Sequence, residues 1–383
     1  MSTSRAEFKN HPSITEINLS AIHENLRQIA LRVHPAEIAA VVKADGYGHG
    51  AVAIAKTALQ AGAKRLAVAH GFEGAALRNT GIEAPIQVMG GFSPEEIPLF
   101  ANHKLEFTVS HFEQADVLAA FAIERSQRVP VHFKFDTGMG RLGFDWREAT
   151  AVLDKLRKHQ SFEYVGLMTH FATSEAADKS FANLQLQRFH QIIETAKAMG
   201  FSFKFTHAAN SGAVLNMPEA NFNLVRPGLI MYGYVPDSAL AQVLPLRTAL
   251  TWRTKLVQVK TLKKGETVGY GQTWRATKET KIGVIPVGYA DGYRRELSNR
   301  FDVLVNGKRA PIAGRICMDM TMLNLGPDSQ AKVGDESVLL GRQGDEEITV
   351  YEMCDALDTI PYEVVCGIGK RVLRIYRSGS GIK

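Results

Sequence analysis

The sequence has few cysteines, no long apolar run and no leader-like start. Its 383 residues include three cysteines, Cys317, Cys354 and Cys366, and this odd, widely spaced set matches neither a disulfide framework nor a metal-ligand pattern. No apolar run approaches the roughly 20 residues that a membrane span requires, and residues 1–13 lack the apolar core of a signal peptide. These absences predict a protein of the reducing cytoplasm, with no metal site and no membrane partner.

Charge of one sign is not concentrated anywhere in the chain. The 45 Lys and Arg residues exceed the 39 Asp and Glu residues, which gives a net charge of +6. These residues are scattered, without the clustered runs and interleaved aromatics of a nucleic-acid-binding surface, so we expect no nucleic acid partner. With 45% hydrophobic and 22% charged residues, the composition is that of an ordinary globular protein, long enough for two or three domains.

Short apolar runs alternate with helical patterns through the first two thirds of the chain. Eight strands that alternate with helices over about 200 residues predict a closed parallel (β/α)8 barrel of the TIM type, an α/β fold. We assign residues 14–245 to this barrel domain. The eight apolar runs span residues 37–43, 65–70, 85–90, 106–110, 129–136, 164–170, 203–209 and 223–233.

After Pro245 the apolar residues recur at every second position, which is the spacing of half-buried strands. The dipeptide Asn306-Gly307 between apolar flanks predicts a β-hairpin, and residues 349–358 show a helical pattern. We therefore expect a mostly antiparallel β domain over residues 246–383, which residues 1–13 join. Its strands are expected within residues 250–260, 281–289, 302–312 and 315–325.

Polar residues collect at the predicted carboxyl ends of the barrel strands. In a (β/α)8 barrel the ligand binds at these ends, and a phosphate group binds after strands seven and eight. Ser211 opens a helix after strand seven, and Gly228 follows Arg226 in strand eight. Taken alone, His170 is most simply a structural histidine and Arg226 half of a buried ion pair. Their shared position with Lys43 at one barrel mouth indicates a functional site.

One motif points to a different cofactor. Residues 138–143 match the G-x-G-x-x-G fingerprint of dinucleotide-binding folds. That fingerprint normally opens the first βαβ unit of a Rossmann domain, whereas this copy follows the fifth of eight predicted strands. Glu163 also lies before the next strand, although a ribose-binding acid belongs at a strand's end. We therefore predict no dinucleotide at this loop.

Nine separated motifs span nearly the whole chain: VVKADGYGHG (41–50), KFDTGMGRLGF (134–144), GLMTHFAT (166–173), HAANSG (207–212), VRPGLIMYG (225–233), VGYGQTW (268–274), PVGYADGY (286–293), GRICMD (314–319) and PYEVVC (361–366). In this order they resemble the motifs of the alanine racemases, which are isomerases that use pyridoxal phosphate and fold as a barrel plus a β domain. The resemblance implies a homodimer whose active sites combine one subunit's barrel with the other's β domain. It also implies interconversion of L- and D-alanine, which supplies D-alanine for the peptidoglycan of the cell wall.

The resemblance further implies which residues transfer protons and hold the cofactor ring. Lys43 would carry pyridoxal 5'-phosphate as a Schiff base and serve as one catalytic base, while Tyr270 from the partner subunit would be the other. Arg226 would face the pyridine nitrogen, with His170 supporting it. Arg141 would face the phenolic oxygen of the cofactor and help to bind the substrate.

The remaining positions implied by the resemblance concern the phosphate, the substrate and the entrance. Met318 would bind the substrate carboxylate through its backbone. Lys134 matches a position at which some members carry a carbamylated lysine, which would turn a repulsive pair with Arg141 into an attractive one. The implied phosphate contacts are Tyr47, Ser211, Gly228 and Tyr362, and the entrance positions are Glu175, Tyr289 and Arg295.

Two bases suit the chemistry of racemisation. A proton leaves one face of Cα and another arrives on the opposite face, so an acid–base group is needed on each side of the cofactor plane. Lysine and tyrosine have reference pKa values near ~10 and need positive neighbours or desolvation to act near neutral pH. An arginine at the pyridine nitrogen would leave that nitrogen unprotonated, which weakens the electron sink and suppresses transamination.

Three alternatives remain open from the sequence. A serine racemase or a broad-spectrum amino-acid racemase would share the fold, and only a substrate panel separates them from an alanine enzyme. A related pyridoxal-phosphate decarboxylase would show a Gly-Gly-Gly phosphate loop, which the chain lacks. A non-catalytic pyridoxal-phosphate-binding protein would be a barrel alone, without the β domain that carries Tyr270 and Met318.

Overall fold

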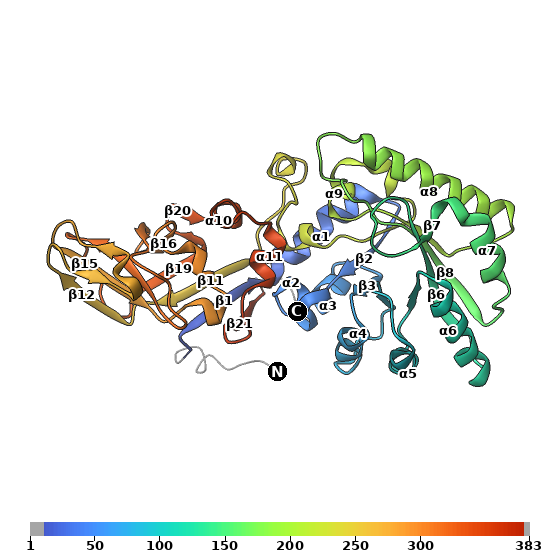
Figure 1. Ribbon diagram of the computed structural model, residues 1–383, viewed down its shortest axis with the longest axis horizontal. Coiled ribbons are helices and arrows are strands. Elements are labelled where there is room, and N and C mark those ends of the chain that lie inside the picture. The colour runs from blue at the N-terminus through green and yellow to red at the C-terminus, as the bar shows by residue number, and fades with distance from the viewer. Residues whose placement is uncertain (1–10, 379–383) are drawn as a thin grey trace. The chain divides into compact units, whose positions relative to one another are not determined.

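The computed structural model describes residues 11–378, and the chain divides into two compact units (Figure 1). The barrel unit is Ala21–Thr248, and the β unit combines the chain up to Ser20 with the chain from Ala249 onward. Within the described residues, no helix is both long enough and apolar enough to cross a membrane.

The first boundary differs from the one we predicted. We expected the barrel domain to begin at residue 14, but β1 (Ser13–Asn18) belongs to the β unit. It pairs antiparallel with β11 (Leu250–Lys255) and parallel with β21 (Leu373–Arg377). The backbone groups of β1 are therefore satisfied by strands from the distant end of the sequence, a pairing that no local pattern reveals. Of residues 1–13, which we expected to join this unit, residues 1–10 lie outside the described range.

Eight parallel strands form a closed ring in the barrel unit, as predicted. They make two arcs with the orders β10-β2-β3-β4 and β5-β6-β8-β9, and β7 (Phe144–Asp145) pairs with β6. A parallel bridge between Gln87 and Glu106 joins the arcs at one seam. At the other seam, the backbone N–H of Arg226 donates to the carbonyl of Ala209 at 2.9 Å. The ring strands are β2 (Glu37–Val41), β3 (Arg65–Val68), β4 (Ile86–Val88), β5 (Phe107–Val109), β6 (Val129–Asp136), β8 (Phe162–Met168), β9 (Phe205–His207) and β10 (Leu224–Val225).

Helices cover the outside of this ring (Figure 1). Buried residues recur every three or four positions along them, as Ile22, Leu26 and Ile29 do in α1, so one apolar face of each helix packs inward. The helices are α1 (Leu19–Val33), α3 (Ala51–Gln60), α4 (Gly71–Arg78), α5 (Ile97–Asn102), α6 (Phe112–Glu124), α7 (Ala149–Arg157), α8 (Ser180–Ala198) and α9 (Ser211–Asn216).

The β unit is mostly antiparallel, as predicted. Its largest sheet has the order β17-β16-β19-β11-β1-β21, with β20 paired to β19, and a second sheet has the order β12-β15-β18. Asn306 and Gly307, with φ of 52° and 72°, form the predicted hairpin turn between β16 and β17. The other elements are β12 (Gln258–Leu262), β13 (Thr267–Val268), β14 (Trp274–Arg275), β15 (Thr280–Ile285), β16 (Asp302–Val305), β17 (Lys308–Pro311), β18 (Thr321–Gly326), β19 (Glu336–Gln343), β20 (Glu346–Ile348), α10 (Val350–Leu357) and α11 (Pro361–Cys366).

Two strands are shorter than the apolar runs that predicted them. The run at 250–260 is divided between β11 and β12, because the N–H of Val257 donates to the carbonyl of Val284 and the chain passes from one sheet to the other. The run at 315–325 becomes a strand only at Thr321. Before it, the N–H of Cys317 donates to the carbonyl of Met320 at 2.9 Å and closes a turn.

Candidate active site

Lys43 stands at the carboxyl end of β2, where the backbone reverses its handedness. It begins α2 (Lys43–Tyr47), in which Ala44, Asp45 and Gly46 have φ of 51°, 52° and 61°. Tyr47 follows with φ of 53°. Three of these four residues carry a Cβ and still adopt the left-handed conformation, which no pattern in the sequence indicated. Such residues cost roughly 1–2 kcal/mol each in a left-handed helix, so surrounding contacts must hold them there.

The carboxylate of Glu73 ties this turn to the start of α4. It accepts hydrogen bonds from the backbone N–H groups of Ala44 at 2.6 Å, Ala69 at 2.8 Å and His70 at 3.1 Å. Asp45 adds a bond by accepting from the N–H of Ala51 at 2.8 Å. Glu73 therefore joins the start of α4 to the residue next to Lys43. We did not predict this role, because a glutamate at the third position of a helix normally signals only a capping box.

Three of the four predicted phosphate contacts lie together in the barrel unit. The N–H of Gly228 donates to the hydroxyl of Ser211 at 3.0 Å. A Cβ on Gly228 would stand 2.4 Å from the hydroxyl oxygen of Tyr47, so only glycine leaves room here. Asn210 caps α9, which begins at Ser211, by accepting from the N–H of Ala213 at 3.0 Å. The hydroxyl groups of Tyr47 and Ser211 thus lie at the backbone of Gly228 and form a cradle of hydrogen-bond donors that suits a phosphate.

Four cationic side chains act on one another at the same barrel mouth. Lys134 is buried at the end of β6. The positive charges of Lys43, Arg141 and Arg226 repel its ammonium group, and the negative charge of Asp136 partly offsets them. Burial, followed by the charges of Arg141 and Arg226, lowers the pKa of Lys134 to about 8. An excess of positive charge at this mouth favours a ligand with several acidic groups.

Arg226 is the most deeply enclosed of these cations, at 3% exposed. Burial lowers its pKa to about 10, so it stays charged near neutral pH. Burial and the nearby charge of Arg226 hold the pKa of His170 well below its usual value, so this imidazole is neutral and can accept a hydrogen bond. Arg226 donates to four acceptors: Nδ1 of His207 at 2.7 Å, the carbonyl of Thr169 at 2.8 Å, the carbonyl of Ala208 at 3.0 Å and Nδ1 of His170 at 3.3 Å.

Three predicted residues of the β unit, Tyr270, Met318 and Tyr289, are exposed. Tyr270 begins the short helix η7 (Tyr270–Gln272) and is 71% exposed. Met318 is 53% exposed, and its carbonyl accepts from the N–H of Ala290 at 3.0 Å. Through this bond the Met318 segment lies beside the short helix η8 (Tyr289–Asp291), whose first residue is also exposed.

The structure thus gathers part of the predicted site in each unit. Tyr362 lies on α11 and Arg295 begins the short helix η9 (Arg295–Leu297), so both belong to the β unit with Tyr270. Glu175 lies in the barrel unit, in the loop between β8 and α8 and beside Gly212. The roles of the predicted residues remain predictions.

The barrel mouth fits pyridoxal phosphate. The cradle at Gly228 matches its phosphate, Lys43 can bond its aldehyde carbon, and the surplus of cations matches its other acidic groups. A lysine at a strand end, a phosphate cradle after the last two strands and a buried arginine define a barrel enzyme that binds a phosphate-bearing cofactor.

Comparison with known proteins gives the family. The alanine racemase N-terminal domain matches residues 17–236, and the alanine racemase C-terminal domain matches residues 249–376. The chain belongs to the alanine racemase family. It is 44% identical over 370 residues to an alanine racemase of Carboxydothermus hydrogenoformans, covering 95% of this chain and 99% of that protein.

Solved structures agree over the same span. Alanine racemase from Bacillus anthracis with bound L-Ala-P superposes with a TM-score of 0.91 at 38% identity, covering 96% of this chain and 95% of that one. Alanine racemase from Bartonella henselae, with covalently bound pyridoxal phosphate, has a TM-score of 0.87 at 28% identity, with coverage of 96% and 99%.

Replacing Glu73 tests the support of the left-handed turn. Glu73→Gln should lower the free energy of unfolding in urea by about 1–3 kcal/mol, because the amide cannot accept all three N–H groups that the carboxylate satisfies. Glu96→Gln is the matched control, since the carboxylate of Glu96 accepts one backbone N–H, from Ser93 at 2.9 Å. Equal losses in the two variants would show that Glu73 is an ordinary helix cap.

The burial of Lys134 leads us to expect a carbamate. A neutral amine attacks CO2, a C–N bond forms and one proton leaves to solvent, so formation should rise as pH passes about 8, where this lysine loses its proton. The negative product would pair with Arg141. Carbon-13 NMR in labelled bicarbonate should show one carbamate signal that Lys134→Met abolishes. A spectrum with no such signal above that pH would rule the modification out.

Proposed function

We propose that this chain is a pyridoxal-phosphate-dependent enzyme that interconverts L- and D-alanine and supplies D-alanine for peptidoglycan. The observation that carries the proposal is the barrel mouth, where Lys43, the Gly228 cradle and the buried Arg226 occur together in a chain that matches alanine racemases over its full length. We place the activity in the cytoplasm, which suits a chain whose three cysteines show no disulfide spacing.

Each part of the cofactor has a proposed holder. Lys43 would bond it covalently, while Tyr47, Ser211 and Gly228, with Tyr362, would hold its phosphate. Arg226 would donate to the ring nitrogen and Arg141 to the phenolic oxygen. When bound, pyridoxal phosphate withdraws electrons from the Cα–H bond of the amino acid and makes that proton acidic.

The side chains then have to move a proton across the plane of Cα. Lys43 is the proposed acid–base group on one face, and Tyr270 is the group on the other. One takes the Cα proton and the other returns a proton on the opposite face, so the configuration inverts. Arg141 and the backbone of Met318 would hold the substrate carboxylate, which keeps Cα between the two groups.

We further propose a homodimer in which Tyr270 serves the partner's Lys43. The residues that would complete the site from the β unit are large and exposed: Tyr270 is 71%, Met318 53% and Tyr289 43% exposed. Side chains of this kind are usually covered by another molecule when they act in a secluded site. Glu175, Tyr289 and Arg295 would then border the substrate entrance.

Isotope exchange tests the reaction itself. L-Alanine incubated with the purified protein and pyridoxal phosphate in deuterated water should yield D-alanine that carries deuterium at Cα, as read by chiral chromatography with mass detection. L-Serine in a parallel incubation tests the broad-spectrum alternative. A protein that binds the cofactor but forms neither D-amino acid would support the non-catalytic alternative instead.

Mixing two inactive variants tests the shared site. Lys43→Ala and Tyr270→Phe should each lose activity, but mixed dimers should regain it, because one of their two sites keeps both native groups. At statistical exchange the recovered activity should be about a quarter of the wild-type value. Verified exchange without recovery would mean that both groups come from one subunit.

A further inference from the structure

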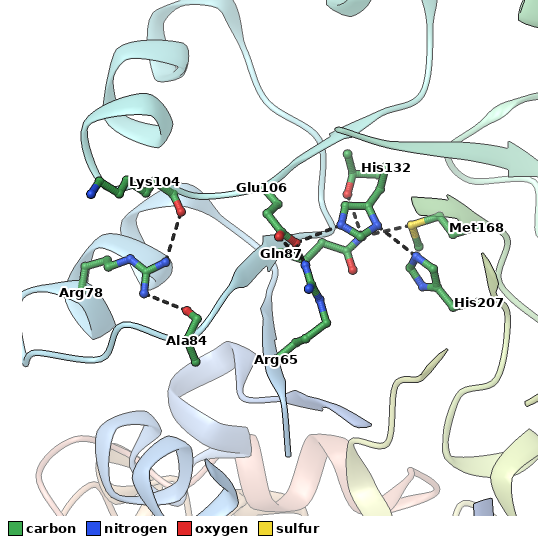
Figure 2. A network of polar contacts seen from close by, with 10 residues as sticks. Arg65, Arg78, Ala84, Gln87, Lys104, Glu106, His132, Met168 and His207 are labelled. Atoms are coloured by element: carbon green, nitrogen blue, oxygen red, sulfur yellow. Dashed lines mark hydrogen bonds and ion pairs between the residues drawn. The ribbon is translucent and has the colours of Figure 1, made fainter. Parts of the chain in front are cut away.

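A chain of buried polar side chains crosses the barrel interior below Arg226. Figure 2 shows its lower part, from His207 to Arg65. Nδ1 of His207 lies 2.7 Å from Arg226, Nε2 of His207 lies 3.0 Å from Nδ1 of His132, and Nε2 of His132 lies 3.0 Å from the carboxylate of Glu106. Arg65 pairs with both oxygens of that carboxylate. All five residues are at most 8% exposed.

In the barrel interior, these polar side chains take the place of the apolar side chains that usually pack there. Barrel interiors are usually filled by branched aliphatic side chains. Here a Cβ on Gly166 would stand 2.0 Å from Nδ1 of His132, so the imidazole occupies space that any other residue would fill. The guanidinium of Arg65 lies 4.6 Å from the ring centroid of Phe205. His132 also shares a strand face with Lys134, two positions along β6. The row of buried polar side chains therefore lies one layer below the cations at the barrel mouth.

The hydrogen bonds have one consistent direction. A guanidinium can only donate, so Nδ1 of His207 must accept from Arg226 and its proton must sit on Nε2. That N–H then donates to Nδ1 of His132, whose own proton must also sit on Nε2. This second N–H donates to Glu106. Both imidazoles are thus neutral and carry their protons on Nε2.

The charges agree with this direction. Burial tends to raise the pKa of Glu106, but the hydrogen bond from His132 and the charge of Arg65 outweigh it and hold that pKa low, so Glu106 is a carboxylate. Together with Arg65 it lines a cavity of about 840 Å³, where water can help to solvate its charge. Burial and the charge of Arg226 lower the pKa of His207 well below its usual value, which keeps this imidazole neutral.

We propose that Glu106 and His132 are positioning residues for Arg226. By accepting from His132, the Glu106 carboxylate fixes the tautomers of both histidines, so that His207 always presents a lone pair to Arg226. Without that fixed acceptor, one N–H of Arg226 would face another N–H, and the guanidinium would turn from the ring nitrogen. The inference rests on the proposed function, because this orientation affects catalysis only if the cofactor binds beside Arg226.

Imidazole tautomers can be measured without any cofactor. In nitrogen-15 NMR spectra of the apoprotein labelled at histidine, His132 and His207 should both show a proton on Nε2 and a bare Nδ1. In Glu106→Gln, an amide can donate as well as accept, so a second population with the proton on Nδ1 of His207 should appear. A proton on Nδ1 of His207 in the wild type would overturn the proposal, whether or not the protein is a racemase.

Variants of the holoenzyme test the effect on the site. Glu106→Gln should reduce kcat roughly two- to thirtyfold, the range seen for residues that act through a network, with KM for alanine changed less than about twofold. It should also shift the absorption maximum of the bound cofactor. In a His132→Phe background, where the link is already cut, Glu106→Gln should shift the maximum no further.

Gln87→Leu is the matched control for packing in the same interior. Gln87 is paired with Glu106 across the seam between β4 and β5, but its side-chain amide donates to the hydroxyl of Thr108 and to the sulfur of Met168, the second of which Figure 2 shows. The Gln87→Leu variant should change kcat by less than about twofold and should leave the absorption maximum of the bound cofactor unshifted. If Gln87→Leu and Glu106→Gln change the spectrum alike, or if neither changes it, Glu106 only stabilises the barrel.

Discussion

A cation kept away from water inside the barrel, Arg226, is the constraint on which the site depends. A buried guanidinium is tolerated only when its N–H groups find acceptors. Backbone carbonyls at Thr169 and Ala208 supply two, and His207 and His170 supply the others as neutral imidazoles. The histidines at this barrel mouth are therefore present as acceptors for an arginine. Their neutrality leaves the site strongly positive, which an anionic cofactor can offset.

The other parts of the site answer the same need from different elements. The left-handed turn places Lys43 and Tyr47 at the end of one strand, and Glu73 ties this turn, through the N–H of Ala44, to the N–H groups of Ala69 and His70 before α4. Gly228 leaves the space that the Tyr47 hydroxyl requires. The barrel unit can thus hold a cofactor, while the second acid–base group is proposed to come from the β unit. On this proposal racemisation needs both units, whereas cofactor binding needs chiefly the barrel.

Much of this arrangement could be predicted from local patterns, and the remainder could not for identifiable reasons. The eight barrel strands and the Asn306-Gly307 hairpin follow from periodicity and turn chemistry, which depend on neighbouring residues. The pairing of β1 with β11 and β21 joins distant segments, so no local pattern places β1 in its sheet. The link between Glu106 and His132 likewise depends on which strands become neighbours in the ring, and no motif contains both.

The central claim, that Lys43 holds the cofactor within this cluster of cations, is open to one direct measurement. Purified protein loaded with pyridoxal phosphate is reduced with sodium borohydride, digested and mapped by mass spectrometry. The account predicts a pyridoxyl group on the peptide that contains Lys43 and on no other. A label on the peptide that contains Lys134, or no label although the cofactor is bound, would contradict it.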